Sequence, residues 1–224
     1  MSPVRWSVVS ALAAVTLVVL IYYALPSKRD EADGLIWEAG QELSKGNDKE
    51  NIRLLKEAAQ LDPTNPKVWW KLCEGYQFTD ELELGVAACK RDIELHHSPL
   101  SYNSLGLAYL AQRNYPEAAK TFEKAVQGSP DPSIHKNLVW ALLSSGQYEK
   151  ALLAAQRLAE VGATDPPSLG AAYQFLGTIY LKLGQKEKAE ESFDKLRKLD
   201  PKWNYKNCEI TTDNKNSVHL LCHN

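Results

Sequence analysis

A repeated pair of short helices is the feature that most limits what this 224-residue chain can fold into. In residues 99–131, apolar and small residues share one face of a predicted helix at the spacing i, i+3, i+4 and i+7: Tyr102, Leu105, Gly106 and Tyr109. A second stripe follows, formed by Ala118, Phe122 and Ala125. Pro116 lies between the stripes and suits the first turn of a new helix, because its missing N–H would have no partner there. Residues 99–131 therefore predict a helical hairpin.

The same pattern recurs along the chain at steps of about 34 residues. Leu138 repeats Leu105 in the next copy, and Leu176 follows in the copy after that, at a slightly longer step. Cys73 stands one copy before Gly106, and the copy before that is fainter. The predicted copies cover residues 33–65, 66–98, 99–131, 132–165 and 170–203.

The spacing and the order of small and aromatic residues resemble the tetratricopeptide repeat family over residues 33–203. The resemblance implies an all-α solenoid of about five repeats, in which the first helix of each repeat lines a concave groove. It also implies a set of groove-facing positions for a protein partner: Trp70, Glu74, Phe78, Asn103, Leu107, Leu110, Lys136, Trp140, Leu143, Gln174, Thr178 and Leu181. Exposed apolar patches of this kind usually mark partner sites. The alternative is that some of these residues pack between helices.

The first 28 residues differ in composition from the repeats. Residues 7–25 carry no charge over 19 positions, which is long enough to cross the hydrocarbon core of a membrane as a helix. Trp6 and Tyr22 lie near its two ends, as interfacial aromatic residues do. The segment predicts a transmembrane signal anchor in residues 1–28. A cleaved signal peptide is the alternative, but the residues before Pro26 make a poor cleavage site.

The four cysteines fall into two local pairs. Cys73 and Cys89 lie about equally far from the turn of the second repeat, so a disulfide between them is feasible. Two buried free thiols are the alternative. Residues 204–224 contain two β-prone runs, and the register that pairs Cys208 with Cys222 places the apolar side chains on one face. We expect a disulfide-closed β-hairpin that caps the last helix of the solenoid.

The cysteine pairs also bear on location, because disulfides persist in oxidising compartments. Together with the predicted anchor they indicate a bacterial inner-membrane protein with its repeats on the periplasmic side. An organelle outer-membrane receptor with cytosolic repeats is the alternative, and it would require all four cysteines to be reduced.

The sequence contains no catalytic motif, neither a phosphate-binding loop nor a G-x-S-x-G or H-E-x-x-H signature. A formal net charge of −2 argues against a nucleic-acid partner. We therefore expect no enzyme activity, cofactor or bound metal. The sequence predicts a membrane-anchored scaffold, such as an assembly factor or accessory subunit of a membrane complex, with a partner segment in its groove. Two alternatives stay open: a structural subunit packed through its transmembrane helix, and a metal- or haem-handling protein using Cys208, His219, Cys222 and His223.

Overall fold

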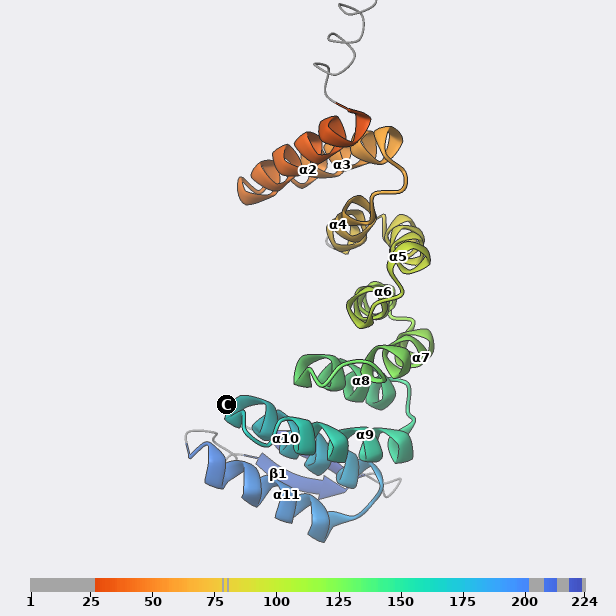
Figure 1. The fold of residues 1–224 in the computed structure, drawn as a ribbon. Coiled ribbons are helices and arrows are strands. Elements are labelled where there is room, and N and C mark those ends of the chain that lie inside the picture. Colours follow the sequence, from red (N-terminus) through yellow and green to blue (C-terminus); the bar gives the residue numbers. More distant parts are fainter. Residues whose placement is uncertain (1–26, 78, 80, 202–207, 213–217, 223–224) are drawn as a thin grey trace, which may run out of the picture. The chain divides into compact units, whose positions relative to one another are not determined.

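The computed structural model describes residues 27–77, 79 and 81–201, together with the backbone of two strands (Figure 1). Its helices follow one another in antiparallel pairs joined by short turns. The chain divides into two compact units, and the boundary between Leu72 and Cys73 falls inside helix α4. The described helices are α2 (Lys28–Ser44), α3 (Asp48–Leu61), α4 (Pro66–Tyr76), α5 (Leu82–His96), α6 (Pro99–Ala111), α7 (Tyr115–Val126), α8 (Pro132–Ser144), α9 (Tyr148–Val161), α10 (Pro166–Lys182) and α11 (Lys186–Leu199).

The N-terminal unit is built around the hairpin of α2 and α3. Helix α2 begins with a capping box, in which Ser27 accepts from the backbone N–H of Asp30 and the Asp30 carboxylate accepts from that of Ser27. Ala39 and Leu55 are fully buried between the two helices. The buried Asn51 side chain donates to the carbonyl oxygen of Ala39 at 2.7 Å, which satisfies a polar group inside this small core.

The C-terminal unit places each helix from α5 to α11 against the next one in the chain. The first helices of its three complete hairpins, α6, α8 and α10, begin in the same way. Each has a proline in its first turn, and each is capped by a side chain that accepts a backbone N–H: Ser98, Asp131 and Asp165. Proline and a capping oxygen both favour a helix start, because the first backbone N–H groups have no partner within the helix.

Each hairpin of the C-terminal unit closes at one shared position, which we call the joint. In the third repeat the joint is Gly106 against Phe122, and a Cβ atom on Gly106 would lie 2.5 Å from the Phe122 ring. In the fifth repeat Gly177 meets Phe193 in the same way, at 2.4 Å. Both phenylalanines are fully buried. Only a glycine therefore permits the helices to approach this closely around an aromatic ring.

The second repeat closes its joint with a disulfide instead. Cys73 and Cys89 occupy the positions one repeat before Gly106 and Phe122, and they are bonded with their Cα atoms 4.7 Å apart. Both are fully buried. The fourth repeat has the buried pair Val139 and Ala155 at the corresponding positions. The predicted disulfide between Cys73 and Cys89 is confirmed.

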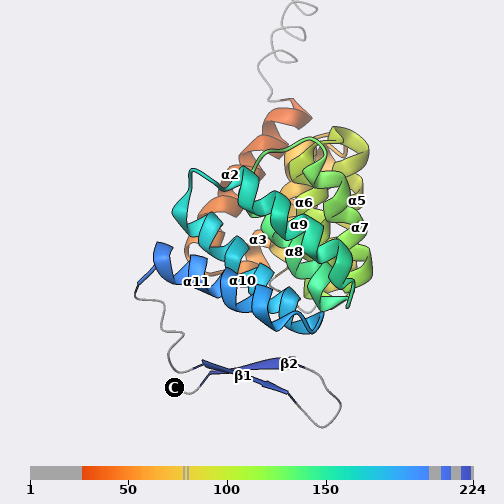
Figure 2. The ribbon, with the colours of Figure 1, turned by 90° about the horizontal axis from the view of Figure 1, so that it is seen from below.

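The C-terminal strands β1 (Cys208–Thr212) and β2 (Val218–Cys222) form an antiparallel pair, shown side by side in Figure 2. Their register pairs Cys208 with Cys222, so the predicted hairpin register is confirmed. The predicted disulfide between these cysteines concerns side chains outside the described part of the chain.

The predicted cap on the last helix is wrong. Strand β2 lies against α10, the first helix of the last hairpin, rather than against the last helix, α11. The outer side of α11 is exposed and charged, with Glu187, Glu190 and Lys198 among its residues. A terminal helix with a polar outer face needs no cover.

No helix within residues 27–77 and 81–201 is long and apolar enough to cross a membrane. The predicted anchor at residues 7–25 lies outside the described residues. The predicted fold class and inner-membrane location both depended on a transmembrane helix, and this finding corrects them. The described structure is an all-α repeat array with a two-stranded C-terminal hairpin.

Candidate functional site

A row of partly exposed side chains runs over the first helices of the hairpins in the C-terminal unit. Helix α8 contacts both α6 and α10, and each of these three helices also contacts the second helix of its own hairpin. The Asn137 side chain on α8 donates to Asn103 Oδ1 on α6 at 3.0 Å, which ties the two helices together. We name this surface the A-helix row and define it by residues that recur at the same helix positions: Asn103, Leu107, Leu110, Lys136, Trp140, Leu143, Gln174 and Thr178.

Trp140 is the most prominent side chain of this row. It is 51% exposed, although a tryptophan side chain gains stability when it is buried. Lys136 lies one turn before it on α8 and is also exposed. Leu107 and Leu143 are half-buried against the core, so part of their surface stabilises the fold. The row therefore combines one free aromatic side chain with a partly apolar floor.

Leu181 does not belong to the row. It occupies the position equivalent to Leu110 and Leu143, but it is only 2% exposed. Helix α10 contacts α8, α9, α11 and strand β2, so more of its surface is covered than in the other first helices. Leu181 is therefore a core residue, and a partner cannot reach it.

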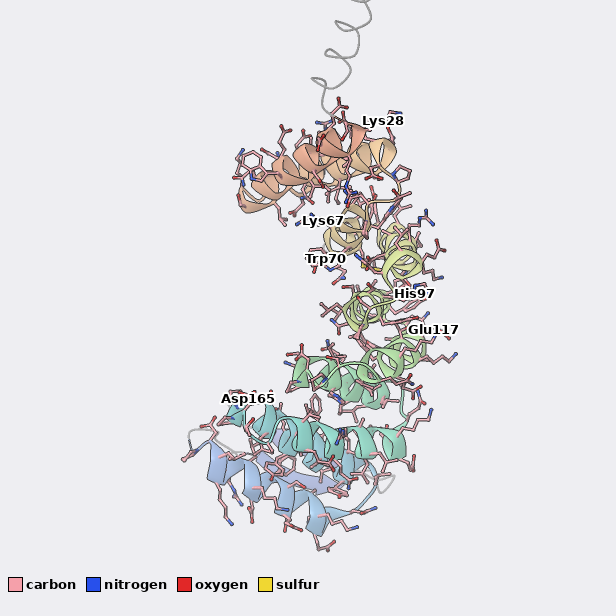
Figure 3. The ribbon with its side chains drawn as sticks, viewed as in Figure 1. Lys28, Lys67, Trp70, His97, Glu117 and Asp165 are labelled. Carbon is pink, nitrogen blue, oxygen red and sulfur yellow. A yellow bond between two sulfur atoms is a disulfide. The ribbon has the colours of Figure 1, made fainter. Side chains whose placement is uncertain are left out.

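The remaining predicted positions lie outside the row. Glu74 is exposed on α4 within the C-terminal unit, and Phe78 lies outside the described residues. Trp70 is 37% exposed, but it belongs to the N-terminal unit. Figure 3 labels Trp70 and Lys67, which both project from α4.

The N-terminal unit has a surface pocket of its own, about 520 Å³ in volume. Trp37 on α2 is 67% exposed at this pocket, and Lys67 and Lys71 on α4 also line it. The Lys71 ammonium lies 5.4 Å from the centre of the Trp70 ring, within the range of a cation–π contact. Sequence reasoning missed Trp37, because the first repeat is faint, although Trp37 stands one repeat before Trp70.

Charge is distributed unevenly between the helices of the C-terminal unit. Helices α6, α8 and α10 contain no Asp or Glu, and their exposed charges are Lys136 and Lys182. The partner helices α7, α9 and α11 carry acidic residues throughout, several of them paired with lysine or arginine. His135 on α8 is buried, and burial lowers the pKa of its imidazole, opposed by the Ser129 carbonyl oxygen 3.2 Å from Nε2.

Within the described residues, no three His, Cys, Asp or Glu side chains come together in a way that could hold a metal ion. The four residues of the metal- or haem-handling alternative, Cys208, His219, Cys222 and His223, have side chains outside the described part of the chain. The A-helix row offers hydrogen-bonding groups, apolar surface and positive charge. These properties suit the binding of a protein or peptide partner.

Models of the tetratricopeptide repeat match residues 90–133, 103–168 and 170–203, which together make up half of the chain. The chain belongs to the tetratricopeptide repeat family. Proteins of this family generally bind protein or peptide partners and act as scaffolds rather than as enzymes. The fold is therefore that of a protein-interaction scaffold.

A human relative, cilia- and flagella-associated protein 70, is 29% identical over 154 residues. The match covers 65% of this chain and only 13% of that protein. Among solved structures, MamA from residue 41 onwards of Desulfovibrio magneticus RS-1 superimposes with a TM-score of 0.68 at 20% identity, covering 78% of this chain and 98% of that one. YrrB, a tetratricopeptide protein with an unusual peptide-binding site, gives a TM-score of 0.64 at 18% identity, covering 75% and 86%. At these identities the structures share the fold alone.

Proposed function

We propose that this chain is an interaction scaffold that holds a segment of a partner protein on the A-helix row. The observation that carries the proposal is the exposure of Trp140 within a row of half-buried apolar residues. Aromatic side chains with an apolar surround are the residues most apt to dominate binding energy at an interface. YrrB has the same fold and a peptide-binding site, which supports peptide binding as a use of this fold.

The row suits a peptide segment or a helix better than a small molecule. Its members come from three helices, and their side chains are exposed or partly exposed. Side-chain amides of Asn103 and Gln174 lie among the apolar residues and are able to bond a peptide backbone. A scaffold with such a surface fits the role of an assembly factor or accessory subunit of a protein complex. We also propose that residues 33–203 form one domain of five repeats.

The experiment that tests this function selects ligands from a display library of random 12-residue peptides on the purified full chain. Fluorescence anisotropy then measures the affinity of the best peptide. Trp140→Ala should weaken binding at least tenfold, because truncating an aromatic anchor removes most of its contact area. Leu153→Ala is the matched control, since Leu153 on α9 is 68% exposed but is not part of the row. Its affinity should stay within twofold of the natural chain. Equal losses in the two variants would contradict the proposal.

A further inference from the structure

The second repeat differs from the later ones in the core residue that follows its joint. Asp92 on α5 stands three positions after Cys89, and the corresponding residues of the next three repeats are Ala125, Leu158 and Leu196. Those three are buried and apolar. Asp92 is buried as well, with only 1% of its surface exposed. The second repeat therefore places a carboxylate where each later repeat places hydrocarbon.

The Asp92 carboxylate is only partly satisfied at this position. Its Oδ1 lies 3.1 Å from Nδ1 of His96, one turn later on α5. Its Oδ2 is buried and has no hydrogen-bond partner within the described residues. A buried acceptor without a partner has lost its hydration and gained no bond in return, which destabilises the closed hairpin. Opening α5 would return this carboxylate to water.

Without its covalent bond the second repeat lacks the residues that fill the later repeats. Phe122 fills the joint of the third repeat, and Phe193 fills that of the fifth. The fourth repeat has a small joint, Val139 against Ala155, but the buried Leu158 follows it. Two reduced cysteines followed by a buried carboxylate would have neither feature. Because the stability of a repeat array is a sum over its repeats and their interfaces, a weak repeat is able to open while its neighbours stay folded.

The second hairpin covers one side of α6. Helix α5 contacts α6, and the Cys89 sulfur lies 3.7 Å from the carbonyl oxygen of Ser104 on that helix. The Gln77 side-chain amide, just after α4, donates to the same oxygen at 3.4 Å. Ser104 is buried. Opening the hairpin would therefore uncover this side of α6, the first helix of the third repeat.

We infer that the bond between Cys73 and Cys89 is a redox switch for the second hairpin. The hairpin is closed while the bond is intact, and α5 opens locally when a dithiol reduces the bond, while α6 to α11 stay folded. One thiolate of the dithiol attacks a cysteine sulfur and breaks the S–S bond, and its second thiol then displaces that cysteine. The dithiol ends as a cyclic disulfide, and its two electrons and two protons end on the cysteines, which become thiols. This inference is independent of what binds to the A-helix row.

Burial decides how the dithiol reaches the bond. Both cysteines are fully buried, so a thiolate attacks only during an opening fluctuation of the hairpin. The Asp92 carboxylate favours such openings, because it is hydrated in the open hairpin and lacks a partner for Oδ2 in the closed one. The same residue therefore speeds the reduction and promotes the opening that follows it.

The test is hydrogen exchange, measured by mass spectrometry on the full chain with Cys208→Ser and Cys222→Ser, so that Cys73 and Cys89 form its one possible disulfide. Dithiothreitol is the dithiol, and a thiol titration confirms that two thiols have been released. The amides of α5 should then exchange about 100-fold faster than in the oxidised chain, because the bond no longer restricts the open state. The amides of α8 to α11 should stay within about threefold of their oxidised rates.

Asp92→Ala and Asp92→Leu on the same background are the matched controls, since they introduce the residues of the third and fourth repeats. In at least one of them, reduction should be slower and should accelerate exchange in α5 by less than about tenfold. Exchange in α5 that stays within threefold after both thiols are released would overturn the switch. Equal acceleration from α5 to α11 would also overturn it, because the bond would then support the whole array. If both controls respond as strongly as the chain with Asp92, the role of the carboxylate is overturned.

Discussion

The second and third repeats solve the same packing problem with different chemistry. In the third repeat, Gly106 removes a side chain so that the fully buried Phe122 ring fits between the helices. In the second repeat, Cys73 and Cys89 fill the equivalent positions with a covalent bond. The first solution depends on the volume of one aromatic ring, and the second depends on the oxidation state of two thiols. The hairpin geometry is thus shared between repeats, while the interaction that stabilises it is not.

The largest expected effect comes from removing the bond of the second repeat. Cys73→Ala with Cys89→Ala should lower the free energy of unfolding by about 3 kcal/mol. The disulfide links residues 16 positions apart, so its loss increases the conformational entropy of the unfolded chain, and the smaller side chains leave a small cavity in the folded one. Urea denaturation of the double variant and of the natural chain, both under oxidising conditions, measures the difference.

A graft tests directly whether the two joints are equivalent. Cys73→Gly with Cys89→Phe transplants the joint of the third repeat into the second, and it should recover at least half of the stability lost in the alanine pair. A reductant should change the stability of the graft no more than that of the alanine pair, because the aromatic joint contains no thiol. A graft that is no more stable than the alanine pair would contradict the claim that the two joints are equivalent.

A further substitution adds a side chain at the joint of the third repeat. Gly106→Ala should cost about 2 kcal/mol, because the new Cβ would lie 2.5 Å from a Phe122 ring that is packed on all sides. Gly40→Ala is the matched control in a helix interior, since no atom lies within 4 Å of a Cβ built there. It should gain about 0.5–1 kcal/mol from helix propensity. Equal effects of the two substitutions in urea denaturation would contradict the role of Gly106.

The turns that join the two helices of a hairpin also differ between repeats, and substitutions there should have smaller effects on stability. Gly46, Gly146 and Gly184 have positive φ at this turn, and Arg113 adopts φ +56° at the same place in the third repeat. A left-handed conformation is costly for a side-chain-bearing residue, so Arg113→Gly should raise stability by about 1 kcal/mol. Gly146→Ala should lower it by a similar amount. Thermal unfolding of both variants checks the opposite signs.

The smallest effect is expected from acidification. Because burial lowers the pKa of His135 in the folded state, the unfolded chain binds a proton there more readily. Stability should therefore fall as the pH drops below the unfolded value of about 6.5. His135→Gln should reduce the slope of stability against pH in this window, and an unchanged slope would show that other groups cause it.

The sequence predicted the parts of the structure that follow from spacing. Repeats of about 34 residues predicted the hairpins, and the symmetry of a hairpin about its turn predicted the bond between Cys73 and Cys89. Alternation of apolar residues predicted the register of the C-terminal strands.

Other features depend on the neighbours that pack against a residue. The spacing of residues in the sequence gives no information about these neighbours. Leu181 has the sequence position of a binding residue, but the neighbours of α10 bury it. The predicted cap was wrong because the charged outer face of α11 needs no cover. Trp37 was missed because the first repeat keeps too little of the pattern to transfer positions onto it.

The joints keep each hairpin closed, and closed hairpins bring α6, α8 and α10 together as one surface. The most direct test of the claim that this surface binds the partner is photo-crosslinking with benzoylphenylalanine. Ser144 is exposed on α8 at the edge of the A-helix row, and Leu153 is exposed on α9 away from it. The account predicts that the selected peptide forms an adduct when the probe replaces Ser144 and none when it replaces Leu153. Adducts at Leu153 but not at Ser144 would contradict it.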